Sequence, residues 1–140
     1  MTKSVTIDAP LERVLEVEHD FASQSQWWPG LLKAEVLETD DQGRPASGRA
    51  EAEVAKVGRY SLVLHFDQRE DGVSWRLDKF TAMQKTQNGD WTFTDRGDST
   101  EATLTLEIDT TVPLPGFLQK KLLDGQVKGV LAGLKKACES

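Results

Sequence analysis

The sequence predicts an α+β fold in which a long C-terminal helix covers one face of a curved antiparallel sheet. Between residues 31 and 112, six segments with alternating apolar and polar side chains are separated by short turn signals such as Asn88-Gly89. No helical segment lies between them to serve as a parallel crossover, so we expect neighbouring strands to pair antiparallel. After Pro113 and Pro115, about 22 residues place apolar side chains at helical spacing, which predicts the covering helix.

The N-terminal part of the chain predicts one further strand and two short helices. Residues 3–8 alternate polar and apolar side chains and bring the sheet to seven strands. Asp8-Ala9-Pro10 supplies an N-cap residue and a proline for a first helical turn, so a helix should begin there and end near His19. A second helix should run from Phe21 to Trp28 and end at Pro29, since proline disfavours a helical conformation in the preceding residue. The later strands are expected at residues 31–39, 46–56, 58–69, 73–80, 83–95 and 100–112.

Alternation gives each predicted strand two faces, and one face carries the large apolar side chains. The opposite face of the last strand carries Glu101, Thr103 and Thr105, a pattern typical of a sheet that water wets on one side. We therefore expect the apolar face to be concave and to be covered by the C-terminal helix. Its members are Tyr60, Leu62, Leu64, Phe66, Val73, Trp75, Leu77, Trp91, Phe93, Leu104, Leu106 and Ile108.

The predicted C-terminal helix has two different flanks. One is an apolar stripe made of Leu123, Val127, Val130, Leu131, Leu134 and Cys138. The other starts with Leu118 and Leu122 and continues as Gly125, Gly129 and Gly133 on successive turns. Each interior helical glycine costs about 0.8–1 kcal/mol relative to alanine, so something should approach the backbone closely. Two interpretations are open: tight packing against another element, or a low floor that leaves room for a ligand between helix and sheet.

Length and charge restrict the functional classes. A chain of 140 residues has room for one domain, which we expect to span residues 1–140. The net charge of −6 argues against a nucleic-acid partner, because binding to phosphates requires clustered Lys and Arg. The short apolar runs predict no integral membrane segment, and the alternating N-terminus does not look like a secretory signal. We therefore expect a cytoplasmic protein, in which Cys138, its one cysteine, is a small apolar filler.

Catalytic and metal-binding motifs are scarce. His19 and His65 are far apart, and no H-E-x-x-H pattern, glycine-rich nucleotide loop or nucleophile elbow is present. His65 follows Leu64, so it should face outward if Leu64 faces inward. Tyr60 is the polar group best placed inside, where its hydroxyl could orient a ligand or its ring could fill the core. The sequence thus predicts no metal and no cofactor, and it gives no positive indication of an enzyme.

Five short segments carry a resemblance to a known family. They are Ser4-Val5-Thr6-Ile7-Asp8-Ala9-Pro10, Trp28-Pro29-Gly30, Asp41-Gln42-Gly43-Arg44-Pro45, Val73-Ser74-Trp75-Arg76-Leu77 and Val112-Pro113-Leu114-Pro115-Gly116-Phe117-Leu118. With the order strand, two helices, six strands and long helix, the chain resembles the START-like, or helix-grip, superfamily (SRPBCC) over nearly its whole length. That superfamily includes pollen-allergen-type lipid carriers and bacterial polyketide cyclase/dehydrase-related proteins. The resemblance implies a cavity between the sheet and the last helix.

The resemblance and the aromatic inner face together favour the binding or transport of an apolar small molecule or a lipid-like ligand. An aromatase/cyclase- or dehydrase-type enzyme acting on a polyketide-like substrate is an alternative, with Tyr60 as the polar residue to test first. A protein-interaction module is another, using Lys120 and Lys121 or an exposed Trp27. The tryptophans of the inner face could instead pack together and fill the core. The expected ligand-binding residues are Trp28, Tyr60, Leu62, Trp75, Leu77, Trp91, Phe93, Leu118, Leu122 and Gly125.

Overall fold

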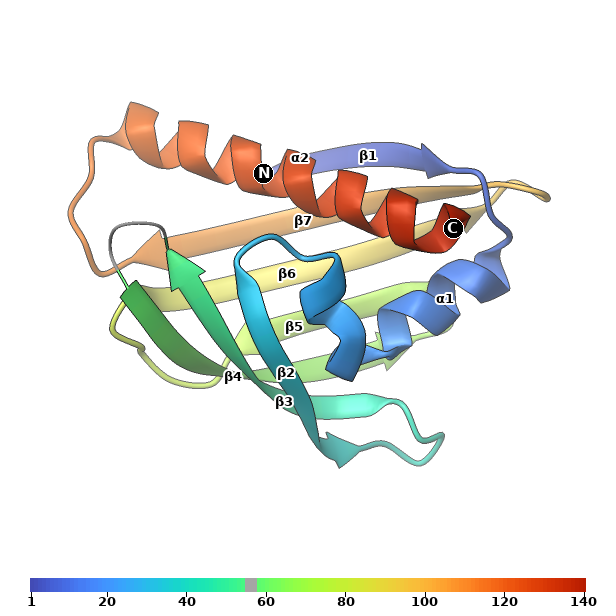
Figure 1. Ribbon diagram of the computed structural model, residues 1–140, viewed down its shortest axis with the longest axis horizontal. Helices are drawn as coiled ribbons and strands as arrows, with labels where there is room; N and C mark the ends of the chain where they lie inside the picture. Colours follow the sequence, from blue (N-terminus) through green and yellow to red (C-terminus); the bar gives the residue numbers. More distant parts are fainter. Residues whose placement is uncertain (55–57) are drawn as a thin grey trace.

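Seven strands form one antiparallel sheet in the computed structural model, which describes residues 1–54 and 58–140 (Figure 1). Along the sheet the strands lie in the order β1-β7-β6-β5-β4-β3-β2. The predicted helix-grip α+β fold is therefore confirmed. The strands are β1 (Thr2–Ile7), β2 (Leu31–Thr39), β3 (Pro45–Val54), β4 (Gly58–Arg69), β5 (Gly72–Leu77), β6 (Gln84–Asp95) and β7 (Thr100–Thr110). The helices are α1 (Leu11–His19), the 3-10 helix η1 (Phe21–Gln26) and α2 (Gly116–Glu139).

Some element ends differ from the prediction. η1 is a 3-10 helix and stops before Trp27, because the next two N–H groups both donate to the Gln24 carbonyl and turn the chain. β5 stops at Leu77, and the hydroxyl of Thr81 then accepts the N–H of Gln84 at 2.9 Å, which forms the turn into β6. The predicted end of the third strand at residue 56 lies outside the described residues.

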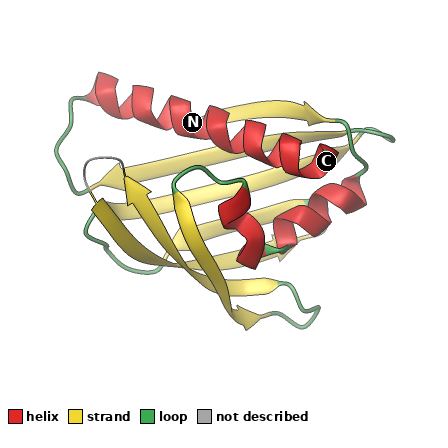
Figure 2. Ribbon diagram, in the orientation of Figure 1, coloured by secondary structure: helices red, strands yellow, loops and turns green. Residues whose placement is uncertain are grey.

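α2 lies across the concave face of the sheet, and α1 and η1 lie near the C-terminal half of α2 (Figures 1 and 2). On the other face, the hydroxyls of Ser4 and Thr103 are hydrogen-bonded at 2.8 Å and exposed to water. The sheet is thus covered on one side, as its alternation predicts. Its buried inner residues include Leu62, Leu64, Val73, Trp75, Trp91, Phe93, Leu104 and Leu106.

α2 is buried along only half of its length. Its buried residues are Val127, Val130, Leu131, Leu134 and Cys138. The same half is tied to the N-terminal segment, because Arg13 donates to the Ala137 carbonyl at 3.3 Å and the Glu139 carboxylate accepts the N–H of Asp8 at 2.8 Å. Residues 116–126 contribute no buried side chain. The first half of α2 therefore contacts the core less than the second half does, mainly through the partly buried Leu123.

Candidate functional site

The glycine flank of α2 faces the turn that follows η1. The backbone carbonyl of Trp27 lies so close to Gly133 that a Cβ there would overlap with it. One turn earlier along α2, a Cβ on Gly129 would lie 3.1 Å from the ring of Pro29. Gly125 differs, because its missing Cβ would have no described neighbour within 4 Å. Tight packing therefore explains two of these glycines, and open space lies beside the third.

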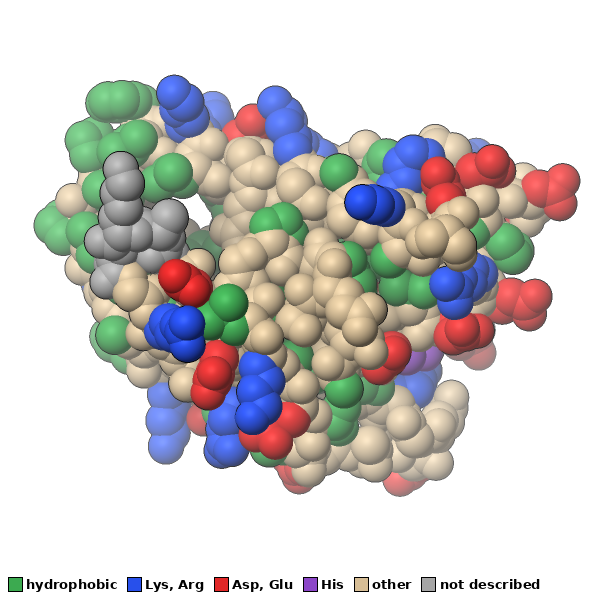
Figure 3. All heavy atoms as spheres, viewed as in Figure 1, with side chains coloured by type: hydrophobic (Ala, Val, Ile, Leu, Met, Phe, Trp, Pro, Cys, Tyr) green, Lys and Arg blue, Asp and Glu red, His purple; other side chains and the backbone are tan. Residues whose placement is uncertain are grey.

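The first half of α2 borders a hollow in the molecular surface, which is visible at the upper left of the space-filling view (Figure 3). Three of the predicted ligand-binding residues lie on this half: Leu118 is half-buried, Leu122 is 57% exposed, and Gly125 is exposed. Phe117 is 77% exposed on the same half. Large apolar side chains thus lie in water where the helix leaves the core, which is the kind of surface that apolar ligands or partners cover.

Trp28 and Trp75 meet edge to face, with ring centroids 6.0 Å apart and an interplanar angle of 73°. The ring of Trp75 also lies over Gly89 on the neighbouring strand β6, where a Cβ would overlap with the indole. Trp75 is therefore held between a glycine and a second tryptophan, while Trp28 remains half-buried. This pair brings the turn after η1 and the inner face of β5 together.

Trp91, Phe93 and Trp27 belong to the buried core. The rings of Trp91 and Phe93 stack at 5.5 Å, and the two residues are 1% and 2% exposed. Trp27 is also buried, so the expectation of an exposed Trp27 at a protein contact is wrong. The reason is the contact of its carbonyl with Gly133, which presses this turn against α2.

Three hydrogen bonds link four side chains across β4, β5 and β6. Nε1 of Trp75 donates to Oε1 of Gln87 at 2.9 Å, and Nε2 of Gln87 donates to Oε1 of Gln84 at 2.8 Å. Nε2 of Gln84 then donates to Oη of Tyr60 at 2.9 Å. Both glutamines are buried, and leaving such amides without partners would be costly. These four residues are the polar chain.

Part of the polar chain could have been found in the sequence. Gln87 shares the parity of Gly89 and Trp91 along β6, so alternation already places it on the inner face. Gln84 has the other parity, and an irregularity in the pairing of β6 with β7 between Gln84 and Thr86 turns it inward. No residue type marks this bulge, so sequence reasoning missed Gln84 and with it the link to Tyr60.

Tyr60 lies half-buried at the start of β4. Burial raises the pKa of its hydroxyl above the usual value of 10, and the hydrogen bond from Gln84 opposes this increase. The hydroxyl therefore keeps its proton at neutral pH. Leu62 follows on the same face of β4 and is buried, and Leu77 of β5 is half-buried. The starts of β4, β6 and α2 lie at the same end of the molecule (Figure 1), so these residues and the open half of α2 share one region.

Comparison with known proteins assigns the family. The sequence profile of the family described as polyketide cyclase / dehydrase and lipid transport matches residues 1–139. The chain belongs to this family. No curated protein matches it by sequence.

Solved structures similar to this polyketide cyclase/dehydrase and lipid transport family member share its START-like fold. A START superfamily protein from Mycobacterium smegmatis has a TM-score of 0.89 at 21% identity, over 99% of this chain and 96% of that one. The Zhui aromatase/cyclase from Streptomyces sp. R1128 has a TM-score of 0.77 at 18% identity, over 99% and 92%. A protein from Thermus thermophilus has a TM-score of 0.76 at 22% identity, over 99% and 95%. At these identities the similarity concerns the fold alone.

The family member also buries a carboxyl group in α1. Burial raises the pKa of Glu18 to about 8, so this acid is mostly neutral at pH 7. Its Oε2 has no hydrogen-bond partner among the described residues and lies 3.7 Å from Nε2 of His19, whose own pKa burial lowers. Glu18 lies one turn after the buried Val14, so helical spacing could have placed it on the inner face of α1. In Figure 1, α1 lies away from the starts of β4 and β6, so Glu18 is not part of the region around the polar chain.

Other polar groups of the family member lie outside the inner face. His65 pairs with Asp78 at 2.7 Å on the outer side of the sheet, and this hydrogen bond holds the pKa of Asp78 below its usual value. Among residues 1–54 and 58–140, no three His, Cys, Asp or Glu side chains come together as a metal site. In the same part of the chain, no helix combines the length and the apolar character that a membrane crossing requires.

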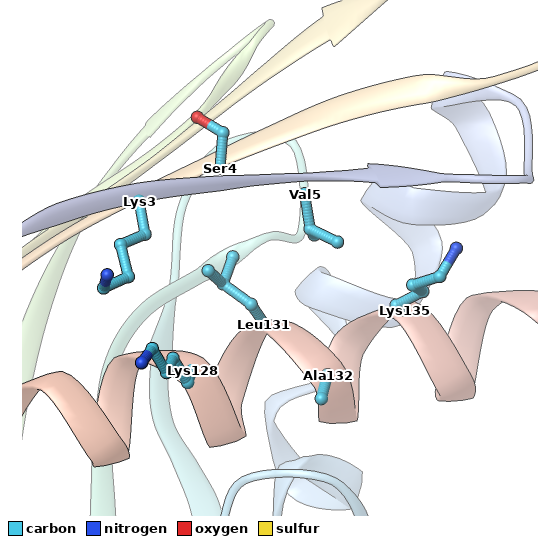
Figure 4. Close-up of a pocket in the computed structure, with 7 residues that line it drawn as sticks. All are labelled: Lys3, Ser4, Val5, Lys128, Leu131, Ala132 and Lys135. Atoms are coloured by element: carbon cyan, nitrogen blue, oxygen red, sulfur yellow. The ribbon is translucent and has the colours of Figure 1, made fainter.

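A groove of about 440 Å³ runs between β1 and α2 and is lined mainly by lysines and small apolar side chains (Figure 4). Its lysines already have partners: Lys3 and Lys128 pair with Asp124 at 3.0 and 2.9 Å, and Lys135 donates to a β1 carbonyl at 2.9 Å. Figure 4 shows Ser4 pointing away from α2. The positive charges of the groove are therefore largely compensated, and it offers no clear anion site.

Proposed function

We propose that the protein binds or transports an apolar small molecule or a lipid-like ligand between the inner face of the sheet and the first half of α2. The observation that carries this proposal is the hollow beside the first half of α2, where a Cβ on the exposed Gly125 would have no described neighbour within 4 Å (Figure 3). A helical glycine costs about 0.8–1 kcal/mol relative to alanine, and here no described neighbour gains from the missing side chain. A ligand that fills this space would account for the glycine.

Sheet and helix would contribute different walls to this site. Leu118, Leu122 and Gly125 would face the ligand from α2. Trp91 and Phe93 would close the site toward the core, where their stacked rings leave little room. Apolar walls with a few placed polar groups are typical of small-molecule sites. The remaining wall would consist of Trp28, Tyr60, Leu62, Trp75 and Leu77.

The family assignment supports this proposal, because the description of the family includes lipid transport. The exposed side chains of Phe117 and Leu122 also support it, because they place apolar surface on the open half of α2. An apolar ligand that passes them would remain in contact with apolar atoms on its way inward. The described inner face therefore supplies the apolar groups that such a ligand would contact.

A second function, an aromatase/cyclase- or dehydrase-type enzyme, is favoured by one observation. The hydroxyl of Tyr60 is a partly buried acid on the inner face, and the fold is similar to that of the Zhui aromatase/cyclase. In an enzyme, Tyr60 would act as a general acid on a polyketide-like substrate. Tyr60→Phe would then abolish turnover while the thermal unfolding midpoint stays unchanged. Unchanged turnover in this variant would exclude that role.

Two measurements test ligand binding. Native mass spectrometry of the protein purified from cells should show a copurifying small molecule, and the uncharged probe N-phenyl-1-naphthylamine should bind with increased fluorescence. Gly125→Leu should weaken probe binding about tenfold or more, because the new side chain would occupy the open space. Ala132→Leu, at an exposed position of the same helix that lines the groove between β1 and α2, is the control and should bind normally, because the proposed site lies outside that groove.

The two variants separate a blocked site from an unstable protein. Leucine has a higher helix propensity than glycine, so Gly125→Leu should fold at least as well as the wild type. Failure of ligand and probe to bind the wild type would overturn the proposal. Equal probe binding by Gly125→Leu and Ala132→Leu would place any binding elsewhere.

A further inference from the structure

We infer that the ligand carries a neutral hydrogen-bond acceptor, a carbonyl oxygen, which accepts the proton of the Tyr60 hydroxyl. This inference rests on the proposed function and adds the chemistry of the ligand at that site. It follows from the direction of the polar chain, which starts at Trp75 and ends at Tyr60.

The indole of Trp75 fixes that direction. An indole N–H can only donate, so the atom of Gln87 that meets it at 2.9 Å must be the amide oxygen. The amide nitrogen of Gln87 then points at Gln84 and can only donate, so Gln84 must also accept with its oxygen. If either amide were flipped, its NH2 group would face another N–H donor and neither hydrogen bond could form. Each orientation is therefore set by the one before it.

Tyr60 receives the last bond of the chain. Nε2 of Gln84 donates to its oxygen, so the phenolic proton cannot be used in this bond and must point elsewhere. Among the described residues, the Tyr60 hydroxyl has this one hydrogen bond. Because burial raises its pKa, the proton is retained at neutral pH. The chain thus ends in a hydroxyl donor on the inner face that has no acceptor among residues 1–54 and 58–140.

The surroundings favour a neutral acceptor over a charged one. The buried polar or charged residues in the described part of the chain include no Lys or Arg, so a carboxylate held deep in the site would lack a buried counter-ion. A ligand that can only donate would cover the half-buried Tyr60 hydroxyl and leave its proton unpaired, which is costly once the ligand has excluded water. An apolar body with a ketone, quinone or ester carbonyl satisfies both conditions.

Fluorenone and fluorene are suitable probes, because these flat tricyclic molecules differ in one carbonyl group. Their dissociation constants would be measured by quenching of tryptophan fluorescence for the wild type and for Tyr60→Phe, a variant that keeps the ring. Tyr60→Phe should weaken fluorenone binding about 3–10-fold and leave fluorene binding unchanged, as expected for one lost hydrogen bond. The carbonyl stretch of bound fluorenone should lie at lower wavenumber in the wild type than in the variant.

The outcomes distinguish the two proposals. Equal effects of Tyr60→Phe on fluorenone and fluorene, or identical carbonyl stretches in both proteins, would overturn the inference and leave apolar ligand binding intact. Binding of neither molecule, nor of N-phenyl-1-naphthylamine, to the wild type would overturn the proposed function and the inference with it. If Tyr60→Phe fails to fold, the wild-type band is compared with that of fluorenone in hexane: a lower wavenumber in the protein supports the inference, and an unchanged wavenumber overturns it.

Discussion

The backbone carbonyl of Trp27 rests directly on Gly133, in a space that a single methyl group would close. This contact joins the turn after η1 to the anchored half of α2 and holds the ring of Trp28 beside Trp75. Gly125, two turns earlier on the same flank, has no such neighbour among the described residues. The glycine flank is thus packed against the Trp27 turn at one end and open at the other.

Alanine substitutions at Gly133 and Gly125 should therefore have opposite effects on stability. Gly133→Ala should lower the free energy of unfolding by about 1–3 kcal/mol, because the new methyl group would displace backbone. Gly125→Ala should raise it by about 0.8–1 kcal/mol through helix propensity alone. Urea unfolding followed by circular dichroism measures both. Changes of the same sign in the two variants would contradict the division of α2 into packed and open halves.

Gly89→Ala should disturb the polar chain at its first member, Trp75. A methyl group at this position would overlap with the indole of Trp75 and push it from Gln87. We expect a loss of about 1–3 kcal/mol in unfolding free energy and a changed near-ultraviolet circular dichroism spectrum. Asn88→Ala, at the adjacent exposed position, is the control and should leave that spectrum unchanged. Similar spectra for both variants would show that Trp75 does not depend on Gly89.

Glu18→Gln should stabilise the protein at neutral pH. Unfolded Glu18 loses its proton above about pH 4.5, while the folded protein keeps it until about pH 8, so wild-type stability falls as the pH rises between these values. Glutamine cannot ionise, and its advantage should reach about 3 kcal/mol at pH 7 and vanish near pH 4. Urea unfolding at several pH values measures this difference. The exposed Glu12→Gln on the same helix is the control, and parallel pH profiles for Glu18→Gln and wild type would refute the buried acid.

Tyr60 is the only tyrosine, so its ionisation can be followed by the absorbance of the phenolate. The midpoint in the folded protein should lie above 10, because burial disfavours the anion. Gln84→Met should raise it further, since the hydrogen bond from Gln84 favours the anion. Tyr60→Phe should show no titration and so verifies the signal. A midpoint at or below 10 in the wild type would mean that the hydroxyl is open to water.

The inner face of the sheet could be predicted because strand alternation is strict where one face is buried. Leu62, Trp75 and Leu104 are all buried as their parity requires. The start of α2 was also predictable, since Pro113 and Pro115 end the preceding strand and set the first helical turn. In these places the local sequence alone, strand alternation or the position of proline, determines the structure.

The features that were missed depend on tertiary context. Gln84 turns inward through a bulge in its pairing with β7, and pairing partners are not visible in one segment. The burial of Glu18 was missed because buried, unpaired carboxyls are rare, although its spacing from Val14 places it inside. The packed and the open parts of the glycine flank could not be told apart from the sequence, because they depend on where the Trp27 turn contacts α2.

The uneven burial of α2 has a mechanical consequence. Residues 116–126 span about 16 Å of helix beyond the packed segment that begins at Val127. A tilt of about 10° around that point would move the start of α2 by about 3 Å without separating any of the buried side chains of its second half. If the proposed ligand site exists, this tilt would widen it for ligands of different thickness while the core stays closed.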